Sequence, residues 1–172
     1  MNAWDTQLAF HQMRSGVVRL TFAPDEAQRA EAAAQLALVS LPALTASVTA
    51  TPWLDGVELN GTFEAVVEQI CGVSLEAFGS AVTGEFQVRV VPAGSPHAAQ
   101  SDGGDVEFDA DAPDPPDVLS ADGIDVAAYV LEHLALELDP FPRKPGVTFD
   151  FQPAELETSP FAALRALTPP KA

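Results

Sequence analysis

Alternation of apolar and polar residues predicts a series of strands in the first half of the chain. Over residues 44–51, apolar side chains alternate strictly with Thr and Ser, which is typical of a strand with one buried face. The alternation returns at 57–67, after an Asp-Gly turn at 55–56, and again at 82–90. A β-branched run at 17–22 predicts one more strand. Together these segments predict an antiparallel sheet.

Two segments predict helices. Residues 23–38 open with Ala-Pro-Asp-Glu, which suits a first helical turn, and continue as an Ala-rich run. Residues 124–138 place apolar side chains three and four positions apart, and Asp122 or Asp125 can serve the first turn. The expected fold is α+β: an antiparallel sheet of about four or five strands, with a partial barrel as one option, covered by two main helices. The segment 71–78 is expected to be a short helix or a corner.

The pattern stops after Pro92. Residues 93–120 hold clusters of Gly, Ser, Pro and Asp, and 12 of the 25 acidic residues lie between Arg89 and Arg143, where no Lys or Arg occurs. Such a segment cannot bury enough apolar surface to offset its chain entropy. We therefore expect one domain over 1–172 with a mobile acidic loop at 93–120.

The last third contains prolines and weaker patterns. The stretch Asp-Pro-Phe-Pro-Arg-Lys-Pro-Gly at 139–146 ends the second helix and is expected to be extended and stiff. Residues 147–151 resemble a short strand. In the C-terminal tail 152–172, Ser159 followed by Pro160 is a plausible start of a short helix.

Charge limits the partners. The 172 residues include 25 Asp and Glu against 8 Lys and Arg, a formal net charge of −17. Such a surface repels phosphates, so we expect no binding to DNA or membranes, and direct RNA binding is unfavourable. Direct RNA binding would need a basic patch built from Arg143, Lys144, Arg165 and Lys171. Basic proteins are the partners that fit. The first six residues lack the basic and apolar regions of a signal peptide, so we expect a cytoplasmic protein.

Catalytic and metal-binding motifs are scarce. The single cysteine, Cys71, excludes an intramolecular disulfide and any zinc site with two thiolates, and its apolar neighbours favour a core position. His133 and Glu137 are spaced as a pair on the helix surface. The acids at 109–114 begin like a calcium loop but do not continue as one. We expect no cofactor and no enzyme, and the alternative is a small metal or thiol enzyme that uses Cys71 and His133.

Four blocks of sequence carry a resemblance to a known family. They are Ile124–Gly146, which includes Ile-Asp-Val and Leu-Ala-Leu, the strand Val57–Gly61, the corner Gln69–Phe78, and the box Ser159–Leu164. In order and spacing they resemble the YceD family, the large ribosomal RNA subunit accumulation proteins of bacteria and plastids. The segment 139–146 is similar to the alphaproteobacterial form.

The resemblance implies a role, and two departures qualify it. The family supports accumulation of large-subunit rRNA. Many of its members carry a second cysteine and later Cys or His residues that suggest a metal, whereas this chain has Ser74 and neither residue type after Pro142. His133 stands where many relatives have a second acid. No metal is therefore expected here.

These observations predict a non-enzymatic factor for 23S rRNA accumulation and large-subunit biogenesis. It would bind a basic protein, such as a ribosomal protein or an RNA-processing factor. The alternative is a nucleic-acid mimic or an adaptor of an RNA-processing nuclease. The candidate partner-binding residues are Asp102, Asp105, Asp109, Asp111, Asp125 and Glu132, with Pro140, Pro142, Pro160 and Phe161 as second candidates.

Overall fold

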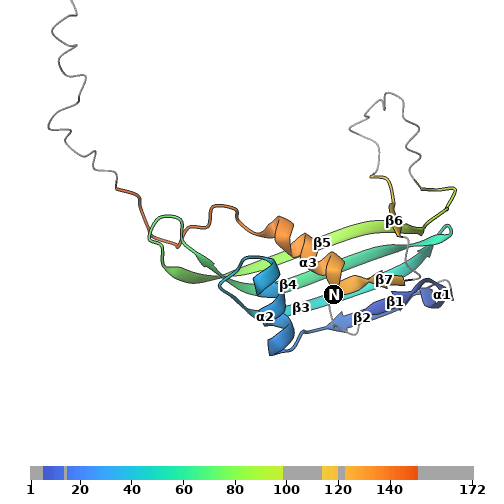
Figure 1. The fold of residues 1–172 in the computed structure, drawn as a ribbon, viewed down its shortest axis with the longest axis horizontal. Coiled ribbons are helices and arrows are strands. Elements are labelled where there is room, and N and C mark those ends of the chain that lie inside the picture. The colour runs from blue at the N-terminus through green and yellow to red at the C-terminus, as the bar shows by residue number, and fades with distance from the viewer. Residues whose placement is uncertain (1–5, 14, 99–113, 120–122, 151–172) are drawn as a thin grey trace, which may run out of the picture.

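The protein is built on one five-stranded sheet (Figure 1). The computed structural model describes residues 6–13, 15–98, 114–119 and 123–150. The strands lie in the order β2-β3-β4-β5-β6, and all neighbours are antiparallel except β5 and β6. Their bounds are Val18–Phe22 for β2, Ser40–Trp53 for β3, Gly56–Ile70 for β4, Ala77–Pro92 for β5 and Asp117–Leu119 for β6. The predicted α+β class is confirmed.

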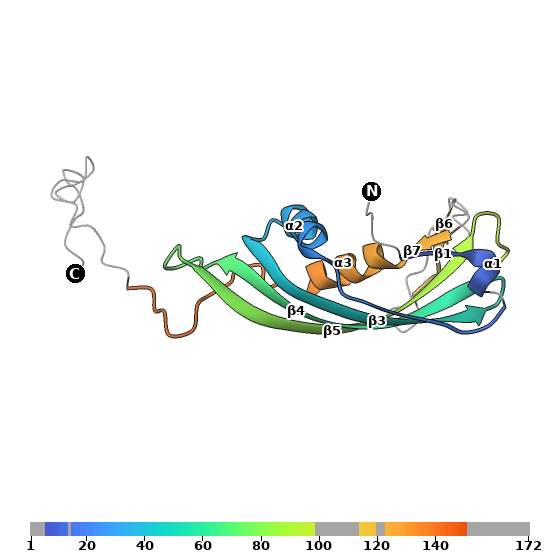
Figure 2. The same ribbon diagram turned by 90° about the horizontal axis from the view of Figure 1, so that it is seen from below.

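The three central strands are long and curve together (Figure 2). They contain 14, 15 and 16 residues, more than the alternating stretches of the sequence cover. The sheet stays open, with β2 and β6 at its edges, so it does not close into a barrel. The four strands predicted from the sequence are all present.

The concave face of the sheet carries the helices (Figure 2). α2 (Glu26–Gln35) and α3 (Val126–Glu137) are the two helices that the sequence predicts. Toward the end of the long sheet that lies away from α2 are α1 (Phe10–Met13) and a small antiparallel sheet of β1 (Gln7–Ala9) and β7 (Gly123–Asp125) (Figure 2). These three-residue and four-residue elements are too short to show a period in the sequence. No helix in the described ranges is long and apolar enough to cross a membrane.

The core lies between the concave face and the helices. Two of its aromatic rings lie across glycines of the neighbouring strand. A Cβ atom at Gly84 would be 2.4 Å from Cζ of Phe63, and one at Gly61 would be 2.3 Å from the ring of Phe86. These glycines therefore provide room for the rings. The largest fully buried side chains include Leu59, Val67, Ile124, Val130 and Leu134.

Two local features differ from the predictions. The β3–β4 turn is Leu54–Asp55, one residue earlier than predicted, since Gly56 already pairs with Trp53. Gly56 is needed for close approach, because a Cβ there would be 2.0 Å from the carbonyl oxygen of Val90. Residues 147–150 form no strand.

The segments between the main elements also have defined positions. Residues 71–76 make a corner between β4 and β5, as one of the two expected options. Strand β6 lies inside the segment that the sequence predicts to be a loop at 93–120. The tail 152–172 lies outside the described residues.

Candidate partner-binding groove

A groove of about 540 Å³ lies where β5, β6 and α3 meet. Residues 114–117, which follow the acidic stretch 99–113 in the sequence, contribute to one side of it. We call it the β5–α3 groove, and its lining residues are Gln87, Val88, Arg89, Asp114, Pro115, Asp117, Tyr129, Glu132 and His133. Three of these side chains are carboxylates.

Tyr129 joins β6 to α3. Its hydroxyl donates a hydrogen bond of 3.0 Å to Oδ2 of Asp117. Burial, and then the nearby negative charge of Asp117, raises the pKa of Tyr129 well above its usual value, so the phenol remains a donor at any physiological pH. The bond, together with the pairing of β6 on β5, places Asp114 and Asp117 beside α3.

His133 is part of the packing between α3 and the sheet. Its ring stacks on Phe86, with centroids 4.4 Å apart and planes inclined by 21°. Its Nδ1 lies 2.8 Å from the carbonyl oxygen of Tyr129, and because a carbonyl only accepts, Nδ1 carries a proton. The prediction that His133 forms a surface pair with Glu137 is wrong, because the imidazole packs on Phe86 of the sheet instead.

Arg89 is the only Lys or Arg among the lining residues, and it is already paired. Its Nε donates to Oε2 of Glu58 at 3.0 Å, and its Cζ lies 5.1 Å from the ring centroid of Trp53. The hydrogen bond from Arg89 is the main cause that lowers the pKa of Glu58. Because Arg89 is paired with Glu58, it does not neutralise the negative charge of the three carboxylates that line the groove.

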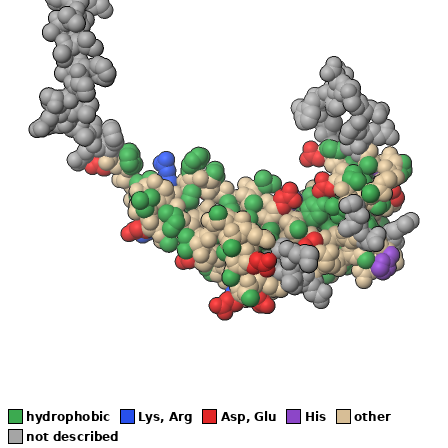
Figure 3. Space-filling view, in the orientation of Figure 1, with side chains coloured by type: hydrophobic (Ala, Val, Ile, Leu, Met, Phe, Trp, Pro, Cys, Tyr) green, Lys and Arg blue, Asp and Glu red, His purple; other side chains and the backbone are tan. Residues whose placement is uncertain are grey.

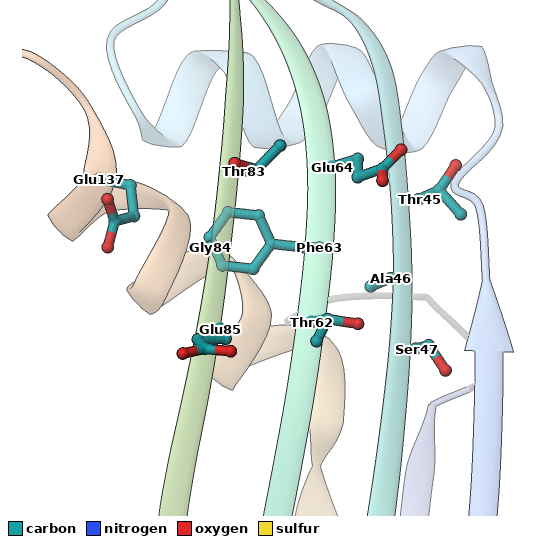
Figure 4. Close-up of a pocket in the computed structure, with 10 residues that line it drawn as sticks. All are labelled: Thr45, Ala46, Ser47, Thr62, Phe63, Glu64, Thr83, Gly84, Glu85 and Glu137. Atoms are coloured by element: carbon teal, nitrogen blue, oxygen red, sulfur yellow. The ribbon is translucent and has the colours of Figure 1, made fainter.

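The acidic surface continues along β5 on the outer face of the sheet. A shallow hollow of about 700 Å³ crosses β3, β4 and β5 there, and Figure 4 shows its carboxylates on β4, on β5 and on the end of α3 beside β5. The polar residues lining it are Thr45, Ser47, Thr62, Glu64, Thr83, Glu85 and Glu137. Figure 3 shows the other face of the molecule, the one that carries the helices: acidic side chains are spread along it as well, whereas Lys and Arg side chains show at few places on it.

The structure separates the candidate residues into groups. Glu132 is exposed and lines the groove. Asp125 is the N-cap of α3: its carboxylate accepts from the backbone N–H groups of Ala127 and Ala128 and from the hydroxyl of Thr6. The candidates outside the described residues are Asp102, Asp105, Asp109, Asp111, Pro160 and Phe161.

Pro140 and Pro142 lie in an irregular segment next to the corner of the sheet. The segment is not extended throughout as predicted, because it bends at Pro140 and Phe141, where the N–H of Phe141 donates to the carboxylate of Asp139. The carbonyl of Pro142 accepts from the N–H of Gly72 at 2.9 Å, and that of Asp139 accepts from the side chain of Gln69 at 3.2 Å. These two hydrogen bonds attach the segment to the sheet.

The sequence alone does not single out Asp114, Asp117 or Tyr129 as a group, because the contact between β6 and α3 has no local signal.

Cys71 lies in the same corner and is fully covered. Its Sγ accepts from the backbone N–H groups of Val73, Ser74 and Lys144, each at 3.4 Å. A hydrogen bond from the Ser74 side chain, followed by the N–H groups of Ser74 and Lys144, lowers the pKa of the thiol from its ordinary 9.0 to about 6. The position is buried as expected, but it is outside the main core cluster and its surroundings are polar.

The corner does not suit a metal ion. Besides Cys71 it offers the hydroxyl of Ser74 and the carboxylate of Glu76, and this carboxylate is paired at 2.8 Å with the ammonium of Lys144, which would repel a cation. Nowhere in the described residues do three or more His, Cys, Asp or Glu side chains form a group that could hold one.

Cys71 and His133 do not form a joint site. His133 stacks on Phe86, while Cys71 is next to the corner where β5 begins at Ala77. The nine residue steps from Ala77 to Phe86 span about 30 Å in an extended strand. The thiol enzyme considered from the sequence therefore has no assembled Cys–His pair in this structure.

The lowered pKa of Cys71 predicts a pH-dependent contribution to stability. The folded state releases the thiol proton near pH 6 and the unfolded chain near pH 9, so the contribution grows as pH rises through this window and is lost as pH falls through about 6. Cys71→Ala lacks it. Urea unfolding should show a larger gap between the native chain and Cys71→Ala at pH 9 than at pH 5.5.

Ser74→Ala provides the control for that measurement. It removes the largest cause of the low thiol pKa and leaves the cysteine in place, so it should reduce the pH dependence. A gap between the native chain and Cys71→Ala that is the same at both pH values would contradict the assignment.

Comparison with known proteins gives one family. The family model described as "Large ribosomal RNA subunit accumulation protein YceD" matches residues 59–168. The matched range includes Cys71 and every residue that lines the β5–α3 groove. No curated protein and no solved structure matches the chain significantly.

Proposed function

This chain belongs to the YceD family of large ribosomal RNA subunit accumulation proteins, and from that premise we propose that it is a non-enzymatic cytoplasmic factor that supports 23S rRNA accumulation and large-subunit biogenesis by binding a basic protein. A ribosomal protein or an RNA-processing factor has the required charge. Membership in the family indicates the process, which is accumulation of large-subunit rRNA. The negative charge of the chain supports a basic protein as the partner.

The observation that carries the proposal is the grouping of carboxylates in the β5–α3 groove. Asp114, Asp117 and Glu132 come from two segments of the chain, and the one Arg beside them is paired with Glu58. The excess of 25 acidic over 8 basic residues extends this field over the whole molecule. Charge complementarity speeds encounter with a basic protein and disfavours other partners.

A capture experiment tests the proposal. The combined variant Asp114→Asn and Glu132→Gln removes two groove charges without touching the Asp117–Tyr129 bond. It should capture several-fold less ribosomal protein from a purified large-subunit protein fraction, with a weaker dependence on salt. The second variant neutralises Asp102, Asp105, Asp109 and Asp111 together.

The matched control is the combined variant Glu26→Gln and Glu31→Gln, which removes two exposed charges from α2. It should capture as much as the native chain does. In a strain that lacks the gene, the control should restore the ratio of large-subunit to small-subunit rRNA better than the groove variant does. Equal capture by the native chain and both acidic variants would exclude the electrostatic mechanism.

Competition by excess RNA distinguishes a nucleic-acid mimic from a protein that docks on a basic partner. If the carboxylates imitate nucleic acid and occupy the RNA site of a nuclease, RNA should displace the protein from its partner. If the chain docks on a basic protein at another surface, the complex should remain when RNA is added at the same ionic strength.

A further inference from the structure

Strand β5 has one free edge. From Ala77 to Val90 it pairs with β4 on one side. On the other side β6 pairs only with the three residues from Val90 to Pro92, and within the described residues no backbone hydrogen bond leaves the stretch 77–89 on that side. An open row of N–H and C=O groups is a template for another strand.

Strand β6 shows that this edge accepts a strand, and prolines explain why it stops. In the parallel register Asp117 lies opposite Val90. The two residues that would continue the strand along β5 are Pro116 and Pro115, which have no N–H to donate. The described part of the chain therefore does not cover this edge beyond Val90.

The free edge also lacks the features that usually protect one. Between Ala77 and Val88 there is no Lys, Arg or Pro and no bulge in the pairing with β4. Arg89, at the end of this stretch, is held by Glu58 on the neighbouring strand and lies over Trp53. It is therefore not free to repel a cationic segment.

Carboxylates flank the edge on both sides. Glu85 points to the outer face, and Glu137 lies beside β5, with its Cγ 3.1 Å from the position that a Cβ at Gly84 would take (Figure 4). Further along, Glu132 and Asp114 line the groove between the edge and α3. An added strand would direct alternate side chains toward these two sets of acids.

We propose that the edge of β5 from Thr83 to Arg89 accepts an extended basic segment of a partner protein as an additional strand. The inference rests on the proposed function, because it specifies how the basic partner docks. Main-chain hydrogen bonds to β5 hold the segment. Lys or Arg side chains on its two faces contact Glu85 on one side and Glu132 and Glu137 on the other.

Amide hydrogen exchange of the full chain tests the proposal. The probe, called the Lys-Thr peptide, has the eight-residue sequence Lys-Lys-Thr-Thr-Lys-Lys-Thr-Thr, which places Lys side chains on both faces of an extended strand. Only every second N–H of an edge strand points outward, so addition of a strand should slow exchange at alternate residues within 83–89. A slowing of about tenfold at saturating peptide is expected for a net hydrogen bond to each protected amide.

Two controls separate strand addition from simple charge attraction. A peptide in which Pro replaces each Thr keeps the charge but loses half of its N–H donors, and it should give no alternating protection. The combined variant Glu85→Gln and Glu137→Gln should weaken binding of the Lys-Thr peptide by about two- to twenty-fold. The Glu26→Gln and Glu31→Gln variant should bind it like the native chain.

Three results would overturn the inference. One is protection of groove residues without the alternating pattern, which would leave the proposed function in place. Another is no binding of the Lys-Thr peptide, in which case the capture experiment decides the proposed function separately. The third is concentration-dependent protection of β5 without peptide, which would identify a second copy of this chain as the occupant.

Discussion

Leu134→Ala is expected to lower the free energy of unfolding by about 2–5 kcal/mol, the range for a buried leucine that leaves a cavity. Leu134 lies in α3 and is fully buried in the core cluster between that helix and the sheet. Its side chain faces opposite to the exposed Glu132. Loss of the leucine loosens the helix that positions one wall of the β5–α3 groove.

Leu136 provides the matched control, because it is the same residue type two positions later in the same helix and is 75 % exposed. Leu136→Ala should change the free energy of unfolding by no more than about 0.5 kcal/mol. Urea unfolding of the two variants measures the difference. Similar losses in both would mean that α3 does not dock on the sheet through Leu134.

Leu134→Ala should also weaken binding of the basic partner more than Leu136→Ala does. A looser α3 moves Glu132 and the Tyr129 hydroxyl that holds Asp117, so Leu134→Ala should reduce capture of basic protein under conditions where it is still folded. Leu136→Ala leaves these groups in place. A groove that functions as a unit thus links the stability of the fold to the strength of partner binding.

The sheet was predictable because its period reports burial directly. In β3 and β4 nearly every second residue is buried and its neighbours are exposed, which is the pattern that the sequence shows. Asp125 was predictable as an N-cap for a similar reason, since the cap is local to the start of α3. Strands β1, β6 and β7 have three residues each, too few to show any period.

The groove was not predictable, because it depends on contacts between distant segments. The Glu58–Arg89 pair spans 31 residues, and its effect is to leave the acids of the groove without a free cation. His133 looks like a surface residue in the helical pattern, yet Phe86 of β5 stacks on it.

Cys71 shows the same limit. Its sequence neighbours are apolar, and the Lys144 N–H group that helps to lower its pKa comes from a segment 73 residues away.

Gly61→Ala and Gly79→Ala are expected to have different effects, although both replace a glycine within the sheet. Gly61 has no positive φ, so its role is steric: a Cβ there would be 2.3 Å from the ring of Phe86. The ring must move, which should cost about 1–3 kcal/mol of stability and disturb the stack on His133. At Gly79 the nearest atom is 3.9 Å away, so alanine should be neutral or slightly stabilising.

Urea unfolding of the two glycine variants gives the comparison. Restriction of the unfolded chain is the same in both, so any difference reports the contact with Phe86. Because Phe86 carries the imidazole of His133, Gly61→Ala should also weaken capture of the basic partner, whereas Gly79→Ala should not. Equal stability of both variants would show that the ring of Phe86 can move aside at little cost, which would contradict the steric role assigned to Gly61.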